Sequence, residues 1–358
     1  ASERARLATP TTPSRRLLTP LPTMHRPPRA PTRARVDIPV ARTCDDTAVV
    51  VAPMRAVDVM RARNARMHTA ESVANGTTNF ALRPDDVVIA TYPKTGTTWT
   101  MQVMHQIRCA AAGADGESFE EITEVVPWDV LALDCGQDLN ASQGVAPRLF
   151  KSHESAETAA RGGRYCVVVR DPVDVFHSFY RFLPAYMGIE PGAITKEEFA
   201  EAIFAGASHS GGFDEHYLSW YDAREADPEN VYMLTFEDMK LDLGRVVDEL
   251  AAFMRVELDD AGRALVLARS SFEYMSNNPK FDDHFVRGKI AAQIGLPPNS
   301  TFTVGKVREG GGVVGEGARE LPASVRDAIE DKWTRRMGAR GFATYDDFRR
   351  AVNRGRRA

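Results

Sequence analysis

The sequence contains little of what stabilises disulfide-rich, metal-binding or membrane-spanning proteins. Its 358 residues include four cysteines, and these lie far apart, at Cys44, Cys109, Cys135 and Cys166. There is no CxxC pair and no disulfide-like spacing, which favours a reducing compartment and argues against a zinc site. No segment approaches the roughly 18 consecutive apolar residues that a membrane span needs. We therefore expect neither a metal centre nor a membrane span.

The chain also lacks a strong charge of either sign. Its formal net charge is −4 at pH 7, which gives no case for binding nucleic acid. Any anion-binding site must therefore be local. With 43% hydrophobic and 26% charged residues, the composition suits one large globular domain or two small ones.

The N-terminal segment differs from the rest of the chain. Its first 36 residues hold eight arginines and seven prolines but one acidic residue, Glu3, and they cannot build a core. We expect a disordered extension over residues 1–45, followed by a folded domain over residues 46–350. An arginine-rich, acid-poor leader also fits an organellar transit peptide, although the prolines weaken an amphipathic helix. The missing initiator Met suggests a trimmed or partial sequence, and both readings of the extension stay open.

The rest of the chain alternates short apolar runs with amphipathic segments. Strands are expected at residues 86–91, 148–152, 165–170 and 231–235. Helices are expected at residues 98–111, 172–182, 243–254 and 324–337, and a capping box at 195–198 opens another. The apolar run at 165–170 is typical of a central parallel strand. The alternation predicts a single α/β domain whose helices flank a central parallel sheet.

A P-loop-like phosphate cradle is expected at residues 91–99, Thr-Tyr-Pro-Lys-Thr-Gly-Thr-Thr-Trp. The first turn of the following helix offers unpaired N–H groups and the positive end of the helix macrodipole. Gly96 lets the backbone approach an anion closely, while Thr97 and Thr98 add hydroxyls. Because Lys94 precedes the only glycine, the order differs from the Walker A motif. A strand-to-helix turn without a ligand is the alternative.

Two further segments carry residues suited to chemistry. Arg170 ends a strand and Ser178 follows eight residues later, so a guanidinium and a hydroxyl can converge on a terminal phosphate. An ion pair between Arg170 and Asp174 is the structural alternative. In the segment Pro-Arg-Leu-Phe-Lys-Ser-His, His153 follows a strand, with Lys151 on the same face. An imidazole suits general-base work on a hydroxyl, although a lone histidine is more often structural.

In this order, the three segments resemble the motifs of the soluble sulfotransferases that use 3′-phosphoadenosine 5′-phosphosulfate (PAPS). The resemblance covers residues 85–340. It implies that a loop holds the 5′-phosphosulfate group through Lys94, Thr95, Gly96, Thr97 and Thr98. It also implies that Arg170 and Ser178 hold the 3′-phosphate. His153 then removes the proton of the acceptor, and Lys151 faces the sulfuryl oxygens.

The same resemblance implies an adenine site. Trp99 matches the residue that stacks on the base, and Ser270-Ser271-Phe272 is similar to the segment that closes over it. Phe236 stands where many members have tyrosine, so packing remains while any hydrogen bond from that hydroxyl is lost. Without the resemblance, Trp99 and Phe272 would be interpreted as core aromatics.

The last motif of the family matches least well. Members carry R-K-G in a loop over the 3′-phosphate, and Arg308, Glu309 and Gly310 fit it best, with glutamate replacing lysine. Arg287-Gly288-Lys289 is a competing match. Composition predicts a flexible loop at 310–317. The dimer motif of animal members is not reproduced around Thr303-Val304, so a monomer and a homodimer both stay open.

The resemblance implies a PAPS-dependent sulfotransferase that acts on a hydroxyl, or alternatively an amine, of a small-molecule acceptor. PAPS would be the co-substrate, and no metal is expected because the lysines supply positive charge. A P-loop-type kinase using ATP and a non-catalytic nucleotide-binding protein are the alternatives. Members of the Golgi type carry a signal anchor, so we expect a soluble, cytoplasmic enzyme, or an organellar one if residues 1–45 are a transit peptide. The acceptor site is expected around residues 128–143 and 182–188.

Overall fold

The computed structural model describes residues 54–204, 211–276, 278–298, 300, 305–307 and 312–354. The predicted extension over residues 1–45 lies outside these ranges, as do Arg308, Glu309 and Gly310. No helix within the described ranges is long and apolar enough to cross a membrane.

A four-stranded parallel sheet forms the centre of the described domain. Its strands are β1 (Val87–Ala90), β2 (Leu149–Ser152), β3 (Arg164–Val169) and β4 (Val231–Thr235). Their order is β2-β1-β3-β4, and each neighbouring pair is parallel. The sequence therefore predicted the four strands and the parallel sheet correctly, and β3 is an internal strand, as its apolar run indicates.

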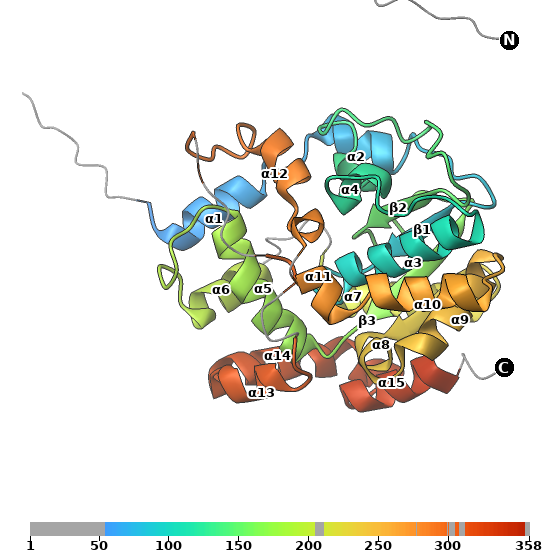
Figure 1. The fold of residues 1–358 in the computed structure, drawn as a ribbon. Coiled ribbons are helices and arrows are strands. Elements are labelled where there is room, and N and C mark those ends of the chain that lie inside the picture. Colours follow the sequence, from blue (N-terminus) through green and yellow to red (C-terminus); the bar gives the residue numbers. More distant parts are fainter. Residues whose placement is uncertain are drawn as a thin grey trace, which may run out of the picture. The chain divides into compact units, whose positions relative to one another are not determined.

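Helices connect and cover the strands (Figure 1). In the first half of the chain they are α1 (Ala56–Asn64), α2 (Ala70–Gly76), α3 (Thr97–Ala111), α4 (Ile122–Val125), α5 (Pro172–Tyr186) and α6 (Lys196–Phe204). In the second half they are α7 (Phe213–Ala226), α8 (Phe236–Leu241), α9 (Leu243–Met254), α10 (Asp260–Arg269), α11 (Phe272–Ser276), α12 (His284–Ile290), α13 (Glu316–Glu320), α14 (Ala323–Arg336) and α15 (Tyr345–Arg354). Short 3-10 turns lie at η1 (Asp129–Leu131), η2 (Pro279–Phe281) and η3 (Gly338–Arg340).

The helices begin and end close to the predicted positions. The capping box that opens α6 is present, since Thr195 Oγ1 accepts from the Glu198 amide and the Glu198 carboxylate accepts from the Thr195 amide. Helix α5 runs to Tyr186, beyond the predicted end at Phe182, and it passes through Pro184. The extension matters because the last turn of α5 contributes to the cavity described below.

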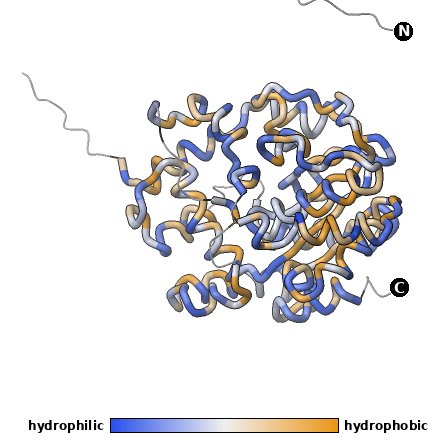
Figure 2. Tube along the Cα trace, viewed as in Figure 1, coloured by the Kyte–Doolittle hydropathy of each residue, from blue (hydrophilic) through white to orange (hydrophobic). Residues whose placement is uncertain are grey.

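Alternating side chains of the strands divide the core into two layers. Val87 and Ile89 of β1 point into the layer formed with α3 and α9, whereas Val88 and Ala90 point into the layer formed with α5, α7 and α14. Figure 1 shows α3, α9 and α10 together on one side of the strands. In Figure 2 hydrophobic and hydrophilic residues alternate along the outer helices, as expected where one face of a helix packs on a core.

The carboxyl ends of the strands meet at one edge of the sheet because all four strands are parallel. The loop that follows β1 leads into α3, β2 leads to His153, and β3 leads to Arg170. In open α/β sheets this edge is where ligands bind. The three segments that the sequence singled out therefore converge at one place, although about 80 residues separate the first from the last.

Candidate active site

A cavity opens at the carboxyl edge of the sheet. Most of the residues that the sequence singled out line it, namely Lys94, Gly96, Thr97, Thr98, Trp99, Lys151, His153, Arg170, Ser178, Phe236 and Phe272. Two others, Thr95 and Ser270, are fully buried and do not line it. Thr95 donates its hydroxyl to the Tyr92 carbonyl, which lies within the same turn.

The loop between β1 and α3 brings backbone close to the cavity. Gly96 has a φ of +117°, and a Cβ there would lie 3.0 Å from the ring of Phe236. Lys94 also has a positive φ, 71°, a conformation that costs a non-glycine residue on the order of 1–3 kcal/mol. Strain of this kind persists where the surroundings impose it, so the loop is held in a defined shape. The amides of the first turn of α3 follow directly.

Side chains around this loop are fixed by short contacts. The hydroxyls of Thr91 and Thr97 lie 2.7 Å apart in a buried hydrogen bond. The Lys94 ammonium lies 3.7 Å from the centroid of the Phe182 ring, which belongs to α5. That distance is typical of a cation–π contact and places a positive charge between the loop and α5.

Arg170 lies at the end of β3, where two structural features hold it. Its guanidinium stands 4.3 Å from the Phe236 ring centroid, and its backbone exchanges hydrogen bonds with the Tyr217 hydroxyl. It also forms an ion pair with Asp174, at 3.6 Å. The ion pair that the sequence left as an alternative is thus present, yet Arg170 still lines the cavity together with Ser178. The two roles are compatible.

Asp174 links this region to the glycine-rich segment. Its two carboxylate oxygens accept hydrogen bonds from the amides of Gly315 and Gly317, each at 2.8 Å. A Cβ on Gly317 would lie 2.5 Å from the Val173 carbonyl oxygen, so the backbones pack directly. Composition predicted a flexible loop at 310–317. From Gly315 onwards, however, the described part is anchored on α5 and begins helix α13.

His153 follows β2 and is buried against Trp128, with ring centroids 4.9 Å apart. Its Nδ1 lies 2.6 Å from the Thr91 carbonyl oxygen. Because a carbonyl oxygen only accepts, Nδ1 carries the hydrogen, and Nε2 is left with its lone pair. Burial, and after it the charge of Lys151, holds the pKa of His153 well below its usual value. The imidazole is therefore neutral near pH 7 and ready to accept a proton.

Lys151 lies on β2, two residues before His153, and it also contacts Trp128. Its ammonium stands 3.2 Å from the Trp128 ring centroid. Burial, followed by repulsion from Lys306, lowers the pKa of Lys151 well below its usual value. Lys151 therefore offers hydrogen-bond donors to the centre of the cavity, and an anion bound beside it would favour its charged form.

Trp99 connects the first loop to the segment that begins α11. Its indole Nε1 donates to the Ser270 carbonyl at 2.8 Å, and its ring meets Phe236 edge to face at 5.8 Å. Phe272 lines the cavity while remaining 44% exposed. The aromatic residues of the predicted adenine site therefore gather around one part of the cavity, with Ser270 contributing its backbone and not its hydroxyl.

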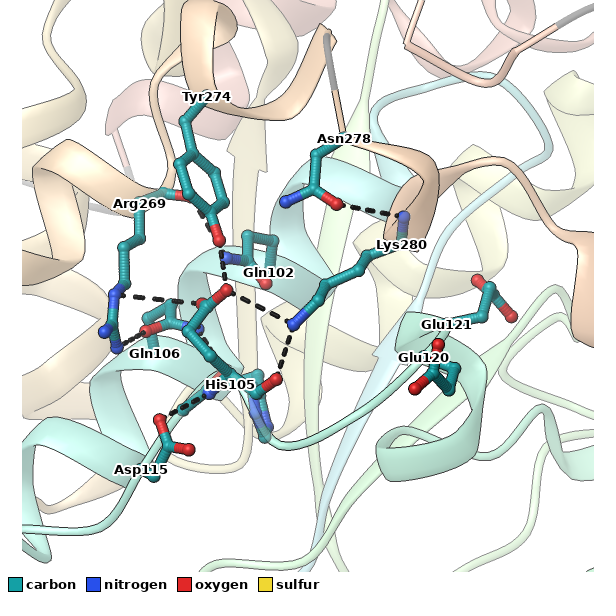
Figure 3. Close-up of polar contacts among 12 residues, drawn as sticks. Gln102, His105, Gln106, Asp115, Glu120, Glu121, Arg269, Tyr274, Asn278 and Lys280 are labelled. Atoms are coloured by element: carbon teal, nitrogen blue, oxygen red, sulfur yellow. Dashed lines mark hydrogen bonds and ion pairs between the residues drawn. The ribbon is translucent and has the colours of Figure 1, made fainter.

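A polar cluster centred on Glu117 stabilises the segment that contains Ser270 and Phe272 (Figure 3). Gln106 donates to the Glu117 carboxylate at 3.0 Å, and the Tyr274 hydroxyl donates to the same group. Arg269 and Lys280 pair with it at 3.8 and 3.4 Å. The loop after α3 is thereby tied to α10, α11 and η2, which surround Phe272.

The late clamp proposed at Arg308, Glu309 and Gly310 lies outside the described residues. Its neighbours Val307 and Gly312 line the cavity. The competing residue, Arg287, is buried in α12, where its guanidinium donates to the carbonyls of Tyr186 and Ser300, each at 3.3 Å. It does not line the cavity. The dimer-motif positions around Thr303-Val304 also lie outside the described residues.

Sequence patterns missed part of the lining. The residues that line the cavity but were not singled out from the sequence include Asn64, Met67, His68, Phe179, Lys240, Asp283 and Lys306. They come from α1 and the turn after it, from α5 and α8, from the residue before α12, and from the segment 305–307. No local pattern marks them, because only the fold brings these separate elements together. Among the described residues, no group of histidine, cysteine and acidic side chains could hold a metal ion.

Comparison with known proteins identifies the family of this chain. The family model of the sulfotransferase domain matches residues 84–294. Dog sulfotransferase 1B1 is 30% identical over 210 residues, and human sulfotransferase 1E1 is 31% identical over 212; each alignment covers 56% of this chain and 69% of the relative. The crystal structure of mouse sulfotransferase SULT7A1 complexed with PAP has a similar fold, with a TM-score of 0.54 at 19% identity, covering 80% of this chain and 94% of that one.

Proposed function

Because this chain belongs to the sulfotransferase domain family, we propose that it transfers a sulfuryl group from PAPS to a hydroxyl group of a small-molecule acceptor. The observation that carries the proposal is the state of His153. Its Nδ1 is committed to the Thr91 carbonyl, so the lone pair of Nε2 is available to accept a proton in the cavity that Lys94 and Arg170 also line. An amine is the alternative nucleophile.

The residues of the first loop fit a phosphosulfate group. Gly96 leaves no space for a side chain, so backbone amides at the start of α3 stay open to an anion. Lys94 adds a positive charge, and Thr97 and Thr98 line the same wall. We assign these residues to the 5′-phosphosulfate.

The region around Arg170 fits the rest of the nucleotide. Arg170 and Ser178 share the lining and would hold the 3′-phosphate with a guanidinium and a hydroxyl. Trp99, Phe236 and Phe272 would enclose the adenine. The late clamp at Arg308–Gly310 stays a prediction, supported by the position of its neighbours in the lining.

In the proposed reaction His153 acts as the general base. Its Nε2 takes the proton of the acceptor hydroxyl, and the Thr91 carbonyl stabilises the imidazolium that forms. When bound, PAPS supplies the sulfuryl group, whose bond to the 5′-phosphate oxygen breaks as the acceptor oxygen bonds to sulfur. Lys151 would stabilise charge on the sulfuryl oxygens. Lys94 and the first amides of α3 would stabilise charge on the departing phosphate.

The remainder of the cavity suits a small, largely apolar acceptor. Its walls include Trp128, Phe179, Phe182, Leu183 and Tyr186, mostly from α5. We propose a cytoplasmic enzyme, with an organellar location as the alternative if residues 1–45 are a transit peptide. The monomer and the homodimer remain alternatives.

A binding titration tests the proposed nucleotide. Purified protein is titrated calorimetrically with 3′-phosphoadenosine 5′-phosphate and with ATP, with and without Mg²⁺. We expect the 3′-phosphorylated nucleotide to bind more tightly, because Arg170 and Ser178 would hold a group that ATP lacks. Equal or better affinity for ATP would overturn the proposal and favour the kinase alternative.

A transfer assay separates an enzyme from a non-catalytic binding protein. Labelled PAPS is incubated with a panel of phenols, alkanols, sterols and amines, and transfer of label to the acceptor is measured. We expect transfer to at least one hydroxyl acceptor. Tight nucleotide binding without transfer to any member of the panel would favour the non-catalytic alternative.

A further inference from the structure

Two charged residues that the proposed reaction does not use stand in the acceptor part of the cavity. Asp283 precedes α12, and Lys306 lies in the described segment 305–307; both line the cavity with Trp128, Tyr186 and His153. Much of the surrounding wall is aromatic or aliphatic. Charged side chains at such a place require an explanation, because each loses its hydration there.

The two residues form a buried ion pair. The Asp283 side chain is 2% exposed and that of Lys306 is 9% exposed, and the Lys306 ammonium donates to Asp283 Oδ1. Burial alone would raise the pKa of Asp283, but pairing with Lys306 and the nearby charge of Lys151 hold that pKa below its usual value. The carboxylate is therefore ionised near pH 7. It sits on a backbone with a φ of 74°, which aspartate adopts less readily than glycine.

A pair of this kind is weak evidence for a purely stabilising role. Removing two charges from water costs as much as their attraction returns, and apolar residues of similar volume often replace such pairs without loss of stability. A ligand that forms hydrogen bonds with both side chains would offset their loss of hydration, and the pair would then serve to bind that ligand. A carboxylate oxygen that accepts and an ammonium that donates would then lie side by side on the wall of the cavity.

The chemistry of the pair selects one kind of ligand group. A neutral hydroxyl has one hydrogen to donate to Asp283 and lone pairs to accept from Lys306, so it complements both. A charged group would be attracted by one member of the pair and repelled by the other, and it would also lose its own hydration in the buried cavity, so a neutral group is favoured. The pair therefore discriminates among acceptors that share a scaffold and differ in a second polar group.

We propose that Asp283 and Lys306 bind a second, neutral hydroxyl of the acceptor, distinct from the hydroxyl that gives its proton to His153. The acceptors of this enzyme are then dihydroxy or polyhydroxy compounds. The inference rests on the proposed sulfuryl transfer and adds the class of acceptor. Asp283 and Lys306 determine specificity in it and take no part in the bond exchange.

The test uses acceptors on phenol, alkanol and sterol scaffolds. Each scaffold is offered with one hydroxyl, with a second hydroxyl, and with an ammonium group in place of the second hydroxyl. We expect the kcat/KM of the wild-type protein for the dihydroxy form to exceed that for the monohydroxy form on the order of 10-fold or more, because the monohydroxy form cannot make the added hydrogen bonds to Asp283 and Lys306. The ammonium form should be the poorest.

Two variants assign this preference to the ion pair. Asp283→Asn and Lys306→Gln should each reduce the ratio of dihydroxy to monohydroxy kcat/KM on the order of 10-fold, while the affinity for 3′-phosphoadenosine 5′-phosphate stays within about twofold. Asp282→Asn is the matched control. Asp282 is the adjacent residue, but its carboxylate is 36% exposed and pairs with His284, so this change should leave the ratio unaltered.

The outcomes separate this inference from the proposed function. An unchanged ratio in both variants, or a wild-type preference for the ammonium form, would overturn the role of the pair while leaving sulfuryl transfer intact. A purely structural role would lower the melting temperature and the rate for every acceptor equally, without moving the ratio, and would also overturn it. If no scaffold is turned over, the same ratio is measured as acceptor affinity in the presence of 3′-phosphoadenosine 5′-phosphate. Failure to bind that nucleotide refutes the proposed function itself.

Discussion

The two parts of the cavity are assembled in different ways. The part that we assign to the nucleotide uses the loop between β1 and α3, the end of β3, and side chains of α5, α8 and α11. The part that we assign to the acceptor uses side chains from α1 and α5, Trp128 before η1, Asp283 before α12, and the segment 305–307. Backbone geometry dominates the first part, and side-chain identity dominates the second.

This difference shows which parts of the sequence determine the binding of each ligand. A phosphate group is held by amides and by a few fixed cations, so the chain must keep short contiguous motifs such as residues 91–99. An apolar acceptor is held by shape, which many combinations of distant side chains can provide. The residues to which we assign the catalytic roles, His153 and Lys151, lie where the parts meet.

The largest expected effect comes from removing the base at that boundary. His153→Ala should lower kcat by about 10²–10⁴-fold, the usual contribution of a positioned general base, and leave nucleotide affinity within about twofold. Steady-state kinetics and calorimetry measure the two quantities. His284→Ala is the control, because His284 is 49% exposed and pairs with Asp282 outside the cavity lining. Turnover retained in His153→Ala would rule out its role as the base.

A smaller effect is expected in the nucleotide part alone. Arg170→Ala should weaken binding of 3′-phosphoadenosine 5′-phosphate by about 2 kcal/mol, roughly 30-fold, because a charge-assisted contact is lost. Arg181→Ala is the matched control, since Arg181 is exposed on α5, the helix that follows Arg170. If Arg170→Ala instead changes acceptor KM and spares nucleotide affinity, our division of the cavity is wrong.

The anchor behind Arg170 should matter less. Asp174→Asn keeps one acceptor oxygen but loses the negative charge and one hydrogen bond to the segment 315–317, so we expect nucleotide affinity to fall by about 1 kcal/mol. Nucleotide affinity is measured by calorimetry for Asp174→Asn, for Arg170→Ala and for the double variant, which tests whether Asp174 acts through Arg170. Because Asp174 would act partly through Arg170, the two losses should not add. Full additivity would contradict this positioning role.

The cluster in Figure 3 provides a still smaller test. Glu117→Gln should weaken nucleotide binding by about 0.5 kcal/mol, because half-exposed ion pairs contribute little and the segment keeps other contacts. Hydrogen exchange of residues 270–276 should increase in parallel. Glu120→Gln is the control, an exposed neighbour on the same loop. A similar change in both variants would remove any special role for Glu117.

The smallest expected change is in the response to mild acid. Because burial and Lys151 lower the pKa of His153, the base stays neutral below pH 6.5, where an unperturbed imidazole would be half protonated. Activity is lost only as the pH falls through that lowered pKa. We therefore expect kcat/KM to change little between about pH 8 and pH 6.5. An acid limb centred at or above pH 6.5 would contradict the buried, neutral base.

The sequence predicted the sheet correctly, and it marked most of the residues that line one part of the cavity, because both depend on local patterns. The apolar run of β3 and the turn at Gly96 are contiguous, and their chemistry can be recognised without the fold. The pattern did not separate residues that line the cavity from those behind it: the Thr95 hydroxyl is used within its own turn, and Ser270 offers its carbonyl to Trp99.

The acceptor part could not be predicted in the same detail. Asp283 and Lys306 are 23 residues apart and have no mutual spacing rule, yet the fold pairs them. Phe182 and its neighbourhood were predicted as acceptor residues, but nothing local indicates that α5 continues through Pro184 to bring Tyr186 to the same wall. Tertiary contacts decide such details.

Helix α5 has one more consequence. It contributes Ser178 to the nucleotide part and Phe182 and Tyr186 to the acceptor part. The length of helix between these residues therefore sets the distance between the two ligands. At a rise of 1.5 Å per residue, Phe182 stands about 6 Å and Tyr186 about 12 Å along the helix axis from Ser178. Inserting a single residue after Ser178 would turn the acceptor face by about 100° and misalign donor and acceptor. A change in the length of α5 between Ser178 and Tyr186 should therefore disturb both parts of the cavity at once, whereas a substitution at Tyr186 should affect the acceptor part alone.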